Sequence, residues 1–396
     1  MIDPWVTLIG IGEDGLTGLS DASRTALDAA EIIIGGPRHL ALAGAGDRGR
    51  EWPVPFDVAP VLALRGRAVA VLVSGDPFWF GAGASLTAHL TPGEWVAHPA
   101  PSCFSLAAAV MGWAVQNTAC AGLHAAPFTR LRPHLTRGCR IIATLRDGNA
   151  PRDLAAWLVE QGFGAMQMTV LERLGGPQER RRQTRAKAFD LTDIAAPVVV
   201  ALNGAELPRG LGLSAAPGRP TAAFHHDGQI TKSPIRALTL AALQPRPDAL
   251  LWDIGGGSGS VSVEWALSGG RAICIEPRAD RMANITANCD DFGVAHRVQR
   301  ITGAAPDALR GLPEPDAVFV GGGGNAAMFD LILSCLPIGA RLVANAVTID
   351  TEALLMALHK QHGGDLLRID IAGSAPLGRM RGWQPARPVV QWALTR

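Results

Sequence analysis

The sequence predicts an α/β protein of two domains whose strands lie mostly parallel. Short apolar runs recur along the chain, and each ends at glycines before a helical pattern begins. This order is typical of buried parallel strands that turn into helices. The composition agrees, because 48% of the 396 residues are hydrophobic, and 46 glycines and 28 prolines supply many short turns.

Strands and helices alternate through the first half. After the first strand, Ser20 and Asp21 are typical cap residues for a helix that extends to about Ala30. Parallel strands place their carboxyl ends at one edge of a sheet, so we expect ligand binding at that edge. The expected strands of this half lie at residues 5–9, 31–34, 68–73, 140–145 and 197–202, and residues 166–176 form a strand followed by a turn.

The densest basic run of the chain covers residues 179–187 and contains four arginines and one lysine. A run of this kind either forms a solvated face or contacts an anionic substrate. We favour the solvated loop or helix face.

A domain boundary is expected where the composition changes. Residues 206–220 are rich in glycine and proline and show little apolar periodicity, as linkers do. We predict a first domain at 1–205, a linker at 206–225 and a second domain at 226–396. The halves are not repeats, because only the second combines a glycine-rich turn with a later acidic residue.

The second half is organised around residues 250–267. A short apolar strand leads through Asp253 into four glycines within five positions, and a helical pattern follows. Such a turn brings backbone N–H groups to a ligand at the positive end of the helix. A dinucleotide fingerprint would need glycine at Ser260. The G-x-G-x-G pattern present here favours S-adenosylmethionine (SAM), with candidate residues Gly255, Gly256, Gly257, Ser258 and Gly259.

Three further segments complete a predicted nucleoside site. Glu276 ends the strand after the turn, 21 residues beyond Gly255, where a carboxylate can accept hydrogen bonds from both ribose hydroxyls. The small residues at 303–305 leave room for an adenine ring, and residues 316–325 form another strand that runs into glycines. An NAD-dependent oxidoreductase and a non-catalytic SAM-binding protein remain as alternatives.

Composition excludes some classes of protein. Thirty-six basic and 35 acidic residues give a net charge of +1, so no global field recruits nucleic acid or a membrane surface. The six cysteines lack metal-site spacing, which predicts reduced thiols, no metal and a cytoplasmic location. No apolar run approaches transmembrane length. The absence of tyrosine removes one type of acid/base residue.

The first half resembles the tetrapyrrole methylases, in particular their corrin-pathway branch. The matching segments are residues 6–15, 35–40, 73–83, 99–113 and 172–182. The resemblance implies a two-lobed class III methylase fold, with cofactor residues Gly10, Gly75, Asp76, Gly81 and Ser102. Cys103 departs from the family, which usually has a second serine at this position.

The second half resembles the class I methyltransferases that also decarboxylate precorrins. The matching segments are residues 230–243, 253–266, 275–288 and 301–309. This implies a Rossmann-like domain with a mostly parallel sheet, and a cofactor site that includes Thr231, Glu276 and Ala304 beside the glycine turn. Gly256 stands where many class I enzymes carry a larger residue, and we expect no harm from it in a tight turn.

Together the resemblances imply an enzyme that acts on precorrin-6B, a reduced tetrapyrrole with many carboxylates, with SAM as co-substrate. The first domain is expected to methylate C5, and the second to methylate C15 and remove the ring C acetate carboxyl. Such methyl transfer needs chiefly alignment of the reactants, so no catalytic side chain is assigned. The resemblance also implies a homo-oligomer.

Several other polar residues have two possible roles. The cluster His225, His226 and Asp227 could bind a metal, but a lid or linker is favoured. Glu264 could be a base or a packed helix residue. Lys232, Arg379 and Arg381 could contact substrate carboxylates, for which the arginine fork is suited, or could be solvated.

Overall fold

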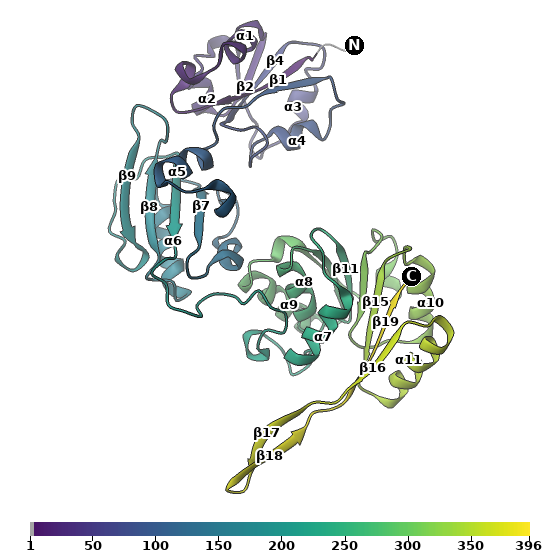
Figure 1. The fold of residues 1–396 in the computed structure, drawn as a ribbon. Coiled ribbons are helices and arrows are strands. Elements are labelled where there is room, and N and C mark those ends of the chain that lie inside the picture. The colour runs from purple at the N-terminus through teal and green to yellow at the C-terminus, as the bar shows by residue number, and fades with distance from the viewer. Residues whose placement is uncertain (1–3) are drawn as a thin grey trace. The chain divides into compact units, whose positions relative to one another are not determined.

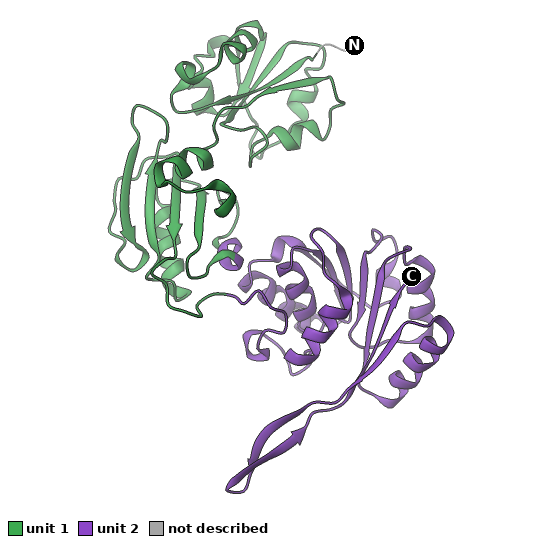
Figure 2. Ribbon diagram, in the orientation of Figure 1, with its two compact units in different colours: residues 1–128, 134–212 green, residues 129–133, 213–396 purple. Residues whose placement is uncertain are grey.

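The computed structural model describes residues 4–396, which form two compact units (Figure 2). The first unit extends to Phe128 and continues from His134 to Gly212. The second comprises Leu213–Arg396 together with the short segment Thr129–Pro133. Within the described residues, no helix is both long and apolar enough to cross a lipid bilayer.

The first lobe of the first unit is a parallel five-stranded sheet with the order β3-β2-β4-β1-β5. Alternate residues of β4 enter separate apolar clusters, Val71 on one face and Leu72 on the other, so both faces are covered. Ser20 caps the first helix, as predicted, by accepting a hydrogen bond from Ser23 N–H. The elements are β1 Val6–Ile11, α1 Asp21–Ala29, β2 Ile32–Gly35, α2 Pro37–Leu42, β3 Gly49–Glu51, α3 Ala59–Leu62, β4 Val69–Ser74, α4 Gly83–Thr87 and β5 Trp95–His98.

The second lobe of the first unit has a mixed sheet with the order β6-β7-β10-β8-β9. β10 runs antiparallel to both of its neighbours, a feature that the sequence did not indicate, because a central antiparallel strand is as apolar as a parallel one. The Trp79 ring of the first lobe stacks on Phe104 of α5 at a centroid distance of 5.2 Å. The elements are α5 Cys103–Met111, β6 Ala119–Gly122, β7 Arg140–Leu145, α6 Ala150–Glu160, β8 Gln167–Glu172, β9 Arg180–Arg185 and β10 Val198–Asn203.

The second unit has a seven-stranded sheet with the order β13-β12-β11-β14-β15-β19-β16 (Figure 1). The five strands from β13 to β15 in this order run parallel, and β19 runs antiparallel to both of its neighbours, β15 and β16. Apolar clusters cover both faces of the sheet. The elements are α7 Ser233–Leu243, β11 Leu250–Ile254, α8 Ser260–Leu267, β12 Arg271–Glu276, α9 Ala279–Asp291, β13 Val298–Thr302, β14 Ala317–Val320, α10 Ala326–Cys335, β15 Arg341–Ala346, α11 Ile349–His362, β16 Asp365–Ile369 and β19 Val389–Thr395.

A two-stranded hairpin interrupts the path from β16 to β19. Its strands, β17 Ala372–Leu377 and β18 Met380–Pro385, pair with each other in a separate small sheet. Figure 1 shows the hairpin as a long arm that extends away from the seven-stranded sheet. Three large apolar side chains on this arm, Leu377, Met380 and Trp383, are 69–78% exposed.

The segment expected as a linker, residues 206–225, contributes buried residues to the second unit. Arg219 and Phe224 are both less than 9% exposed. The Phe224 ring stacks on Phe292 at a centroid distance of 4.8 Å. The part of this segment that follows Gly212 is therefore packed against the second unit.

Candidate functional site

The glycine turn of the second unit joins β11 to α8. Gly255, Gly257 and Gly259 have φ angles of +72°, +60° and +70°, a region that side chains with a Cβ rarely adopt. Gly259 is the residue immediately before α8, so the backbone of the turn lies at the amino end of this helix. The structure therefore has the strand–glycine–helix turn that the sequence predicted, and its role in binding a nucleoside stays a prediction.

Position 256 requires glycine because of a neighbouring side chain and not because of its backbone angle. A Cβ at this position would collide with the Sγ atom of Cys274 on β12. Cys274 is fully buried, so it has little room to move away. Cys274 therefore takes the space that a larger residue at position 256 would need, and glycine fits beside it.

Glu276 lies at the carboxyl end of β12 with its side chain directed to the turn. Its Oε2 accepts a hydrogen bond from Gly257 N–H at 2.9 Å, and its Oε1 accepts one from Arg278 N–H at 3.1 Å. The residue is only 2% exposed. A carboxylate has about four lone-pair sites, so Glu276 can still accept hydrogen bonds from a ligand.

The predicted segments of the second site converge around this turn. Gly303 N–H donates to the carbonyl of Glu276 at 3.2 Å, which brings Ala304 beside that strand end. Gly321 N–H donates to Ile254 O at 3.0 Å. The carbonyl oxygen of Gln229, two residues before Thr231, lies 3.3 Å from where a Cβ of Gly257 would be.

Three loops of the first unit also converge, around Gly10 and Gly75. Gly75 N–H donates to Ile11 O, and Gly75 O accepts from Ala100 N–H, each at 3.2 Å. A Cβ on Gly10 would collide with Gly75 O. A Cβ on Gly75 would lie 2.7 Å from Pro101 O, and the φ of Gly75 is +60°. The ends of β1 and β4 therefore meet the start of α5 in a close backbone cluster.

The side chains of the other predicted residues in the first unit have local partners. Asp76 Oδ1 accepts a hydrogen bond from Phe78 N–H at 2.8 Å. Ser102 is buried and caps α5 by accepting a hydrogen bond from Ser105 N–H at 3.1 Å. A Cβ on Gly81 would lie 2.5 Å from Pro77 O. These contacts give each residue a role in shaping the loops.

Comparison with known proteins identifies both halves. Residues 6–190 match the Tetrapyrrole (Corrin/Porphyrin) Methylases, and residues 222–396 match the Precorrin methyltransferase domain. A precorrin-6Y C(5,15)-methyltransferase (decarboxylating) from Sinorhizobium sp is 46% identical over 408 residues, which cover 100% of this chain and 97% of that protein. The chain belongs to this family.

Two other precorrin-6Y C5,15-methyltransferases are also similar. One from Mycobacterium tuberculosis is 40% identical over 401 residues, covering 99% of this chain and 100% of that protein. The crystal structure of the C-terminal domain from Rhodobacter capsulatus is 62% identical, with a TM-score of 0.46, and covers 46% of this chain and 100% of that domain.

Membership of the precorrin-6Y C5,15-methyltransferase family confirms the predicted fold class and enzyme class. The chain is a decarboxylating C-methyltransferase of cobalamin biosynthesis, with a tetrapyrrole methylase domain followed by a Rossmann-like methyltransferase domain. The oxidoreductase and non-catalytic alternatives receive no support.

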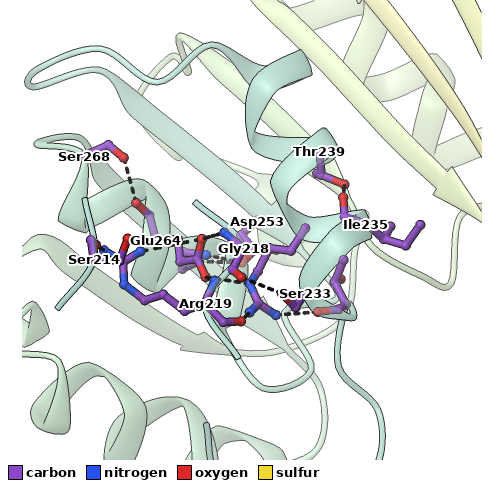
Figure 3. A network of polar contacts seen from close by, with 12 residues as sticks. Ser214, Gly218, Arg219, Ser233, Ile235, Thr239, Asp253, Glu264 and Ser268 are labelled. Carbon is purple, nitrogen blue, oxygen red and sulfur yellow. Dashed lines mark hydrogen bonds and ion pairs between the residues drawn. The ribbon is translucent and has the colours of Figure 1, made fainter. Parts of the chain in front are cut away.

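Glu264 of this family member is part of a buried ionic network (Figure 3). Its carboxylate accepts hydrogen bonds from Gly218 N–H at 2.6 Å and from Arg219 N–H at 2.9 Å. Arg236 Nε donates to the same carboxylate at 2.8 Å, and both side chains are fully buried. Glu264 is therefore committed to structural contacts, which favours the packed role over that of a base.

The Arg236 guanidinium continues this network toward the predicted cofactor residue Thr231. It donates to the carbonyl oxygens of Thr231 and Arg219, and its Cζ lies 4.6 Å from the centre of the Phe224 ring. Arg236 was not among the site residues predicted from the sequence. A lone arginine within an apolar helix, SPIRALTLAAL, was the available signal.

Four of the remaining polar candidates of the second unit have partners within the protein. His225 pairs with Asp291, and Asp227 pairs with Arg281, each at 2.9 Å. His226 Nδ1 accepts a hydrogen bond from Gly228 N–H. Arg381 donates to the Oγ and O atoms of Ser374 within the hairpin. Lys232 and Arg379 are exposed, Lys232 immediately before α7 and Arg379 at the tip of the hairpin.

The basic run of residues 179–187 forms the edge strand β9. Arg180 and Arg182 bind Glu172 on β8, which is fully buried, at 2.6 and 3.0 Å. Burial works against ionisation of Glu172, but hydrogen bonds from Arg180, Ala195 N–H and Arg182 hold its pKa below the ordinary value. The run was expected to be a solvated loop or helix face. It is a strand instead, with Arg180 and Arg182 paired to Glu172 and with Arg181 and Arg185 exposed.

Asp253 precedes the glycine turn and is fully buried. Its Oδ2 accepts hydrogen bonds from Ser262 N–H at 3.1 Å and Ser262 Oγ at 2.6 Å, whereas Oδ1 has no partner within residues 4–396. Burial raises the pKa of Asp253 from 3.8 to about 6, so the folded protein holds this proton more tightly than the unfolded chain does.

This pKa shift predicts a pH dependence of stability. The contribution of Asp253 to stability is fully present below pH 3.8 and is lost as the pH rises through about 6. The loss amounts to about 3 kcal/mol. Asp253→Asn keeps an acceptor for Ser262 and does not titrate, so its free energy of unfolding should fall less between pH 3.5 and 7 than that of the wild type. If the free energy of unfolding in urea fell equally for the two proteins between these pH values, the prediction would be contradicted.

Proposed function

We propose that the protein transfers methyl groups from SAM to C5 and C15 of precorrin-6B, the family's precorrin-6Y substrate. It also decarboxylates the ring C (C12) acetate, which gives precorrin-8. The convergence of the glycine turn, Glu276 and the Ala304 loop in the second unit carries the proposal. We assign C5 methylation to residues 1–205, and C15 methylation and decarboxylation to residues 226–396.

SAM fits the second unit through contacts that this turn can offer. Glu276 would accept hydrogen bonds from the ribose hydroxyls, and the bare backbone of Gly255–Gly259 would lie against the methionine end. Ser258 supports this assignment, because its Oγ is buried with no hydrogen-bond partner within residues 4–396. The methyl donor supplies an electrophilic carbon, and the enzyme aligns this carbon with the nucleophilic meso carbon of the tetrapyrrole.

In the first unit, we propose that Gly10, Gly75, Asp76, Gly81 and Ser102 form a second SAM site. The backbone cluster at the ends of β1 and β4 supports this site, because bare glycine backbone lets a ligand approach closely. No acid or base is assigned in either unit. For decarboxylation, the conjugated pyrrole system is the electron sink.

The proposal is tested with full-length chains, SAM and precorrin-6B, with the products followed by mass spectrometry and by NMR of a ¹³C-labelled methyl group. Wild type should add both methyl groups and lose carbon dioxide. Glu276→Ala removes the ribose acceptor, so it should abolish methylation at C15 and retain methylation at C5. Gly75→Ala introduces a clash with Pro101 O, so it should show the reverse. If either variant lost both methylations equally, the assignment of chemistry to domains would be wrong.

We also propose that the protein is a homo-oligomer and that the β17–β18 arm contacts a second copy of the chain. The arm exposes Leu377, Met380 and Trp383, and no other strand of the described chain pairs with it. Exposed apolar side chains on unpaired strands favour association.

We further propose a cytoplasmic location, supported by six free cysteines.

A triple variant has serine in place of Leu377, Met380 and Trp383. Its molar mass, measured by light scattering, should fall to that of a smaller assembly. The loss of buried apolar surface between copies is the reason. Ile338→Ser is the matched control, because Ile338 is also apolar and 93% exposed but lies outside the arm. An unchanged mass for the triple variant would exclude the arm as the contact.

A further inference from the structure

Four polar side chains gather at the carboxyl edge of the first sheet and have no role in the function described above. They are Glu13, Arg38, His39 and Ser74. Glu13 follows β1, Arg38 and His39 follow β2, and Ser74 ends β4. These three strands are parallel neighbours in the order β2-β4-β1, so their carboxyl ends lie side by side.

Arg38 is the centre of this cluster. Its Nη1 forms an ion pair with Glu13 Oε1. Its Nη2 contacts Ser74 Oγ at 2.8 Å and His39 Nε2 at 2.7 Å, and Ser74 Oγ lies 2.8 Å from His39 Nε2. One end of the guanidinium is therefore held by three side chains from three loops.

The chemistry of these contacts fixes the state of His39. Arginine carries only donors, so His39 Nε2 must accept, and the ring proton is on Nδ1. Burial and the charge of Arg38 lower the pKa of His39 to about 4, so the ring is neutral at physiological pH. A neutral imidazole and a hydroxyl orient the guanidinium without cancelling its charge.

The cluster lies beside the proposed cofactor residues of the first unit. Ser74 immediately precedes Gly75, and Glu13 belongs to the loop that begins after Ile11, the residue next to Gly10. The second lobe reaches the same place, because a Cβ on Gly176 would lie 2.5 Å from Glu13 Cβ. The Arg38 guanidinium is therefore at the junction of the two lobes, where the β1 and β4 loops meet the loop after β8.

The Arg38 side chain retains the capacity to bind another anion. It is 36% exposed, whereas Glu13 is 13% exposed. Glu13, His39 and Ser74 contact only its two terminal nitrogens, Nη1 and Nη2. Within residues 4–396, its Nε–H has no hydrogen-bond acceptor. A planar guanidinium fork accommodates a carboxylate better than any other cationic side chain.

We propose that Arg38, oriented by His39 and Ser74, binds a carboxylate side chain of the tetrapyrrole during C5 methylation. This inference rests on the proposed function and specifies one substrate contact within it. Glu13 neutralises Arg38 in the absence of substrate, and the substrate carboxylate competes with it for the guanidinium. His39 and Ser74 are positioning residues, because they act through Arg38.

The test uses the full-length chain and measures methylation at C5 and at C15 separately, with a ¹³C-labelled methyl donor and varied precorrin-6B concentration. Arg38→Met should raise the KM for the tetrapyrrole in C5 methylation by about tenfold to a hundredfold, as expected for a lost charged hydrogen bond. The kcat at C5 and both constants at C15 should stay close to wild type. Arg38→Lys should recover part of the loss, because it restores charge without the fork.

Arg67→Met is the matched control. Arg67 forms a comparable ion pair with Glu31, but at the amino ends of β2 and β4. It should leave the KM at C5 unchanged. The opposite change at the cluster, Glu13→Gln, removes the competing carboxylate and should lower the KM at C5.

The outcomes separate this inference from the proposed function. If wild type methylates neither carbon of precorrin-6B, the proposed function fails. If wild type methylates both and Arg38→Met leaves the KM at C5 unchanged, or lowers only kcat, the carboxylate-binding role is overturned. Equal losses at C5 and C15 would also overturn it.

Discussion

Glu264→Gln is expected to unfold the second unit at a much lower urea concentration than the wild type. The substitution keeps the size of the side chain but removes its charge, and Arg236 is then left buried without a counter-ion. Removal of one partner from a buried ion pair costs about 3–5 kcal/mol. Hydrogen exchange of peptides from α7 and α8, measured across a urea series, reports the loss within the second unit.

The first unit supplies the control for this prediction. Glu31→Gln breaks the ion pair between Glu31 and Arg67, whose side chains are 53% and 47% exposed, and should change the free energy of unfolding far less, because exposed ion pairs contribute little. Replacement of Glu264 by leucine and of Arg236 by methionine should recover only part of the loss. The charge of Arg236 is then gone, but the buried Arg219 still loses its ion pair with Glu264. Equal stability of Glu264→Gln and wild type would show that the network contributes nothing.

Gly256→Ala is expected to weaken SAM binding by at least about tenfold, equivalent to about 1.4 kcal/mol. The new Cβ collides with Cys274 Sγ, so either the turn or β12 must shift. Overpacking of this kind typically costs about 1–3 kcal/mol. Isothermal titration of the full-length chain with SAM measures the effect at the second-unit site.

Removal of the colliding atom provides the decisive comparison. Cys274→Ala should restore most of the affinity when combined with Gly256→Ala, because the alanine at position 274 lacks the Sγ. Cys274→Ala should not restore the affinity of Gly255→Ala. At position 255 the φ angle is +72°, and Gly322 O would lie 2.9 Å from the new Cβ. Additive effects of Gly256→Ala and Cys274→Ala would contradict the proposed collision.

The features that could be predicted from sequence are those encoded within a few neighbouring residues. The glycine turn after β11 and the helix cap at Ser20 each depend on residues close together in the chain. Glu276 was predictable because parallel β12 must end beside β11. The resemblance to the tetrapyrrole methylases, and not this reasoning, pointed to the loops around Gly10 and Gly75.

The features that escaped prediction depend on distant partners. Glu264 contacts Arg219 and Arg236, which are 45 and 28 residues away in sequence, and no local pattern links them. Cys274 restricts Gly256 only because β12 lies next to the turn. Arg180 and Arg182 face Glu172 because β8 and β9 form an antiparallel pair, and basic composition alone does not show this pairing.

The position of β19 has a consequence for synthesis of the chain on the ribosome. Residues 389–395 form the strand between β15 and β16. The edges of β15 and β16 that bind this strand therefore stay unpaired until it has emerged from the exit tunnel. The first unit closes its two sheets with residues that end at Asn203, and it can fold while the second unit is still being translated. Translation that stops before residue 389 therefore yields a folded first unit joined to an open, aggregation-prone sheet edge.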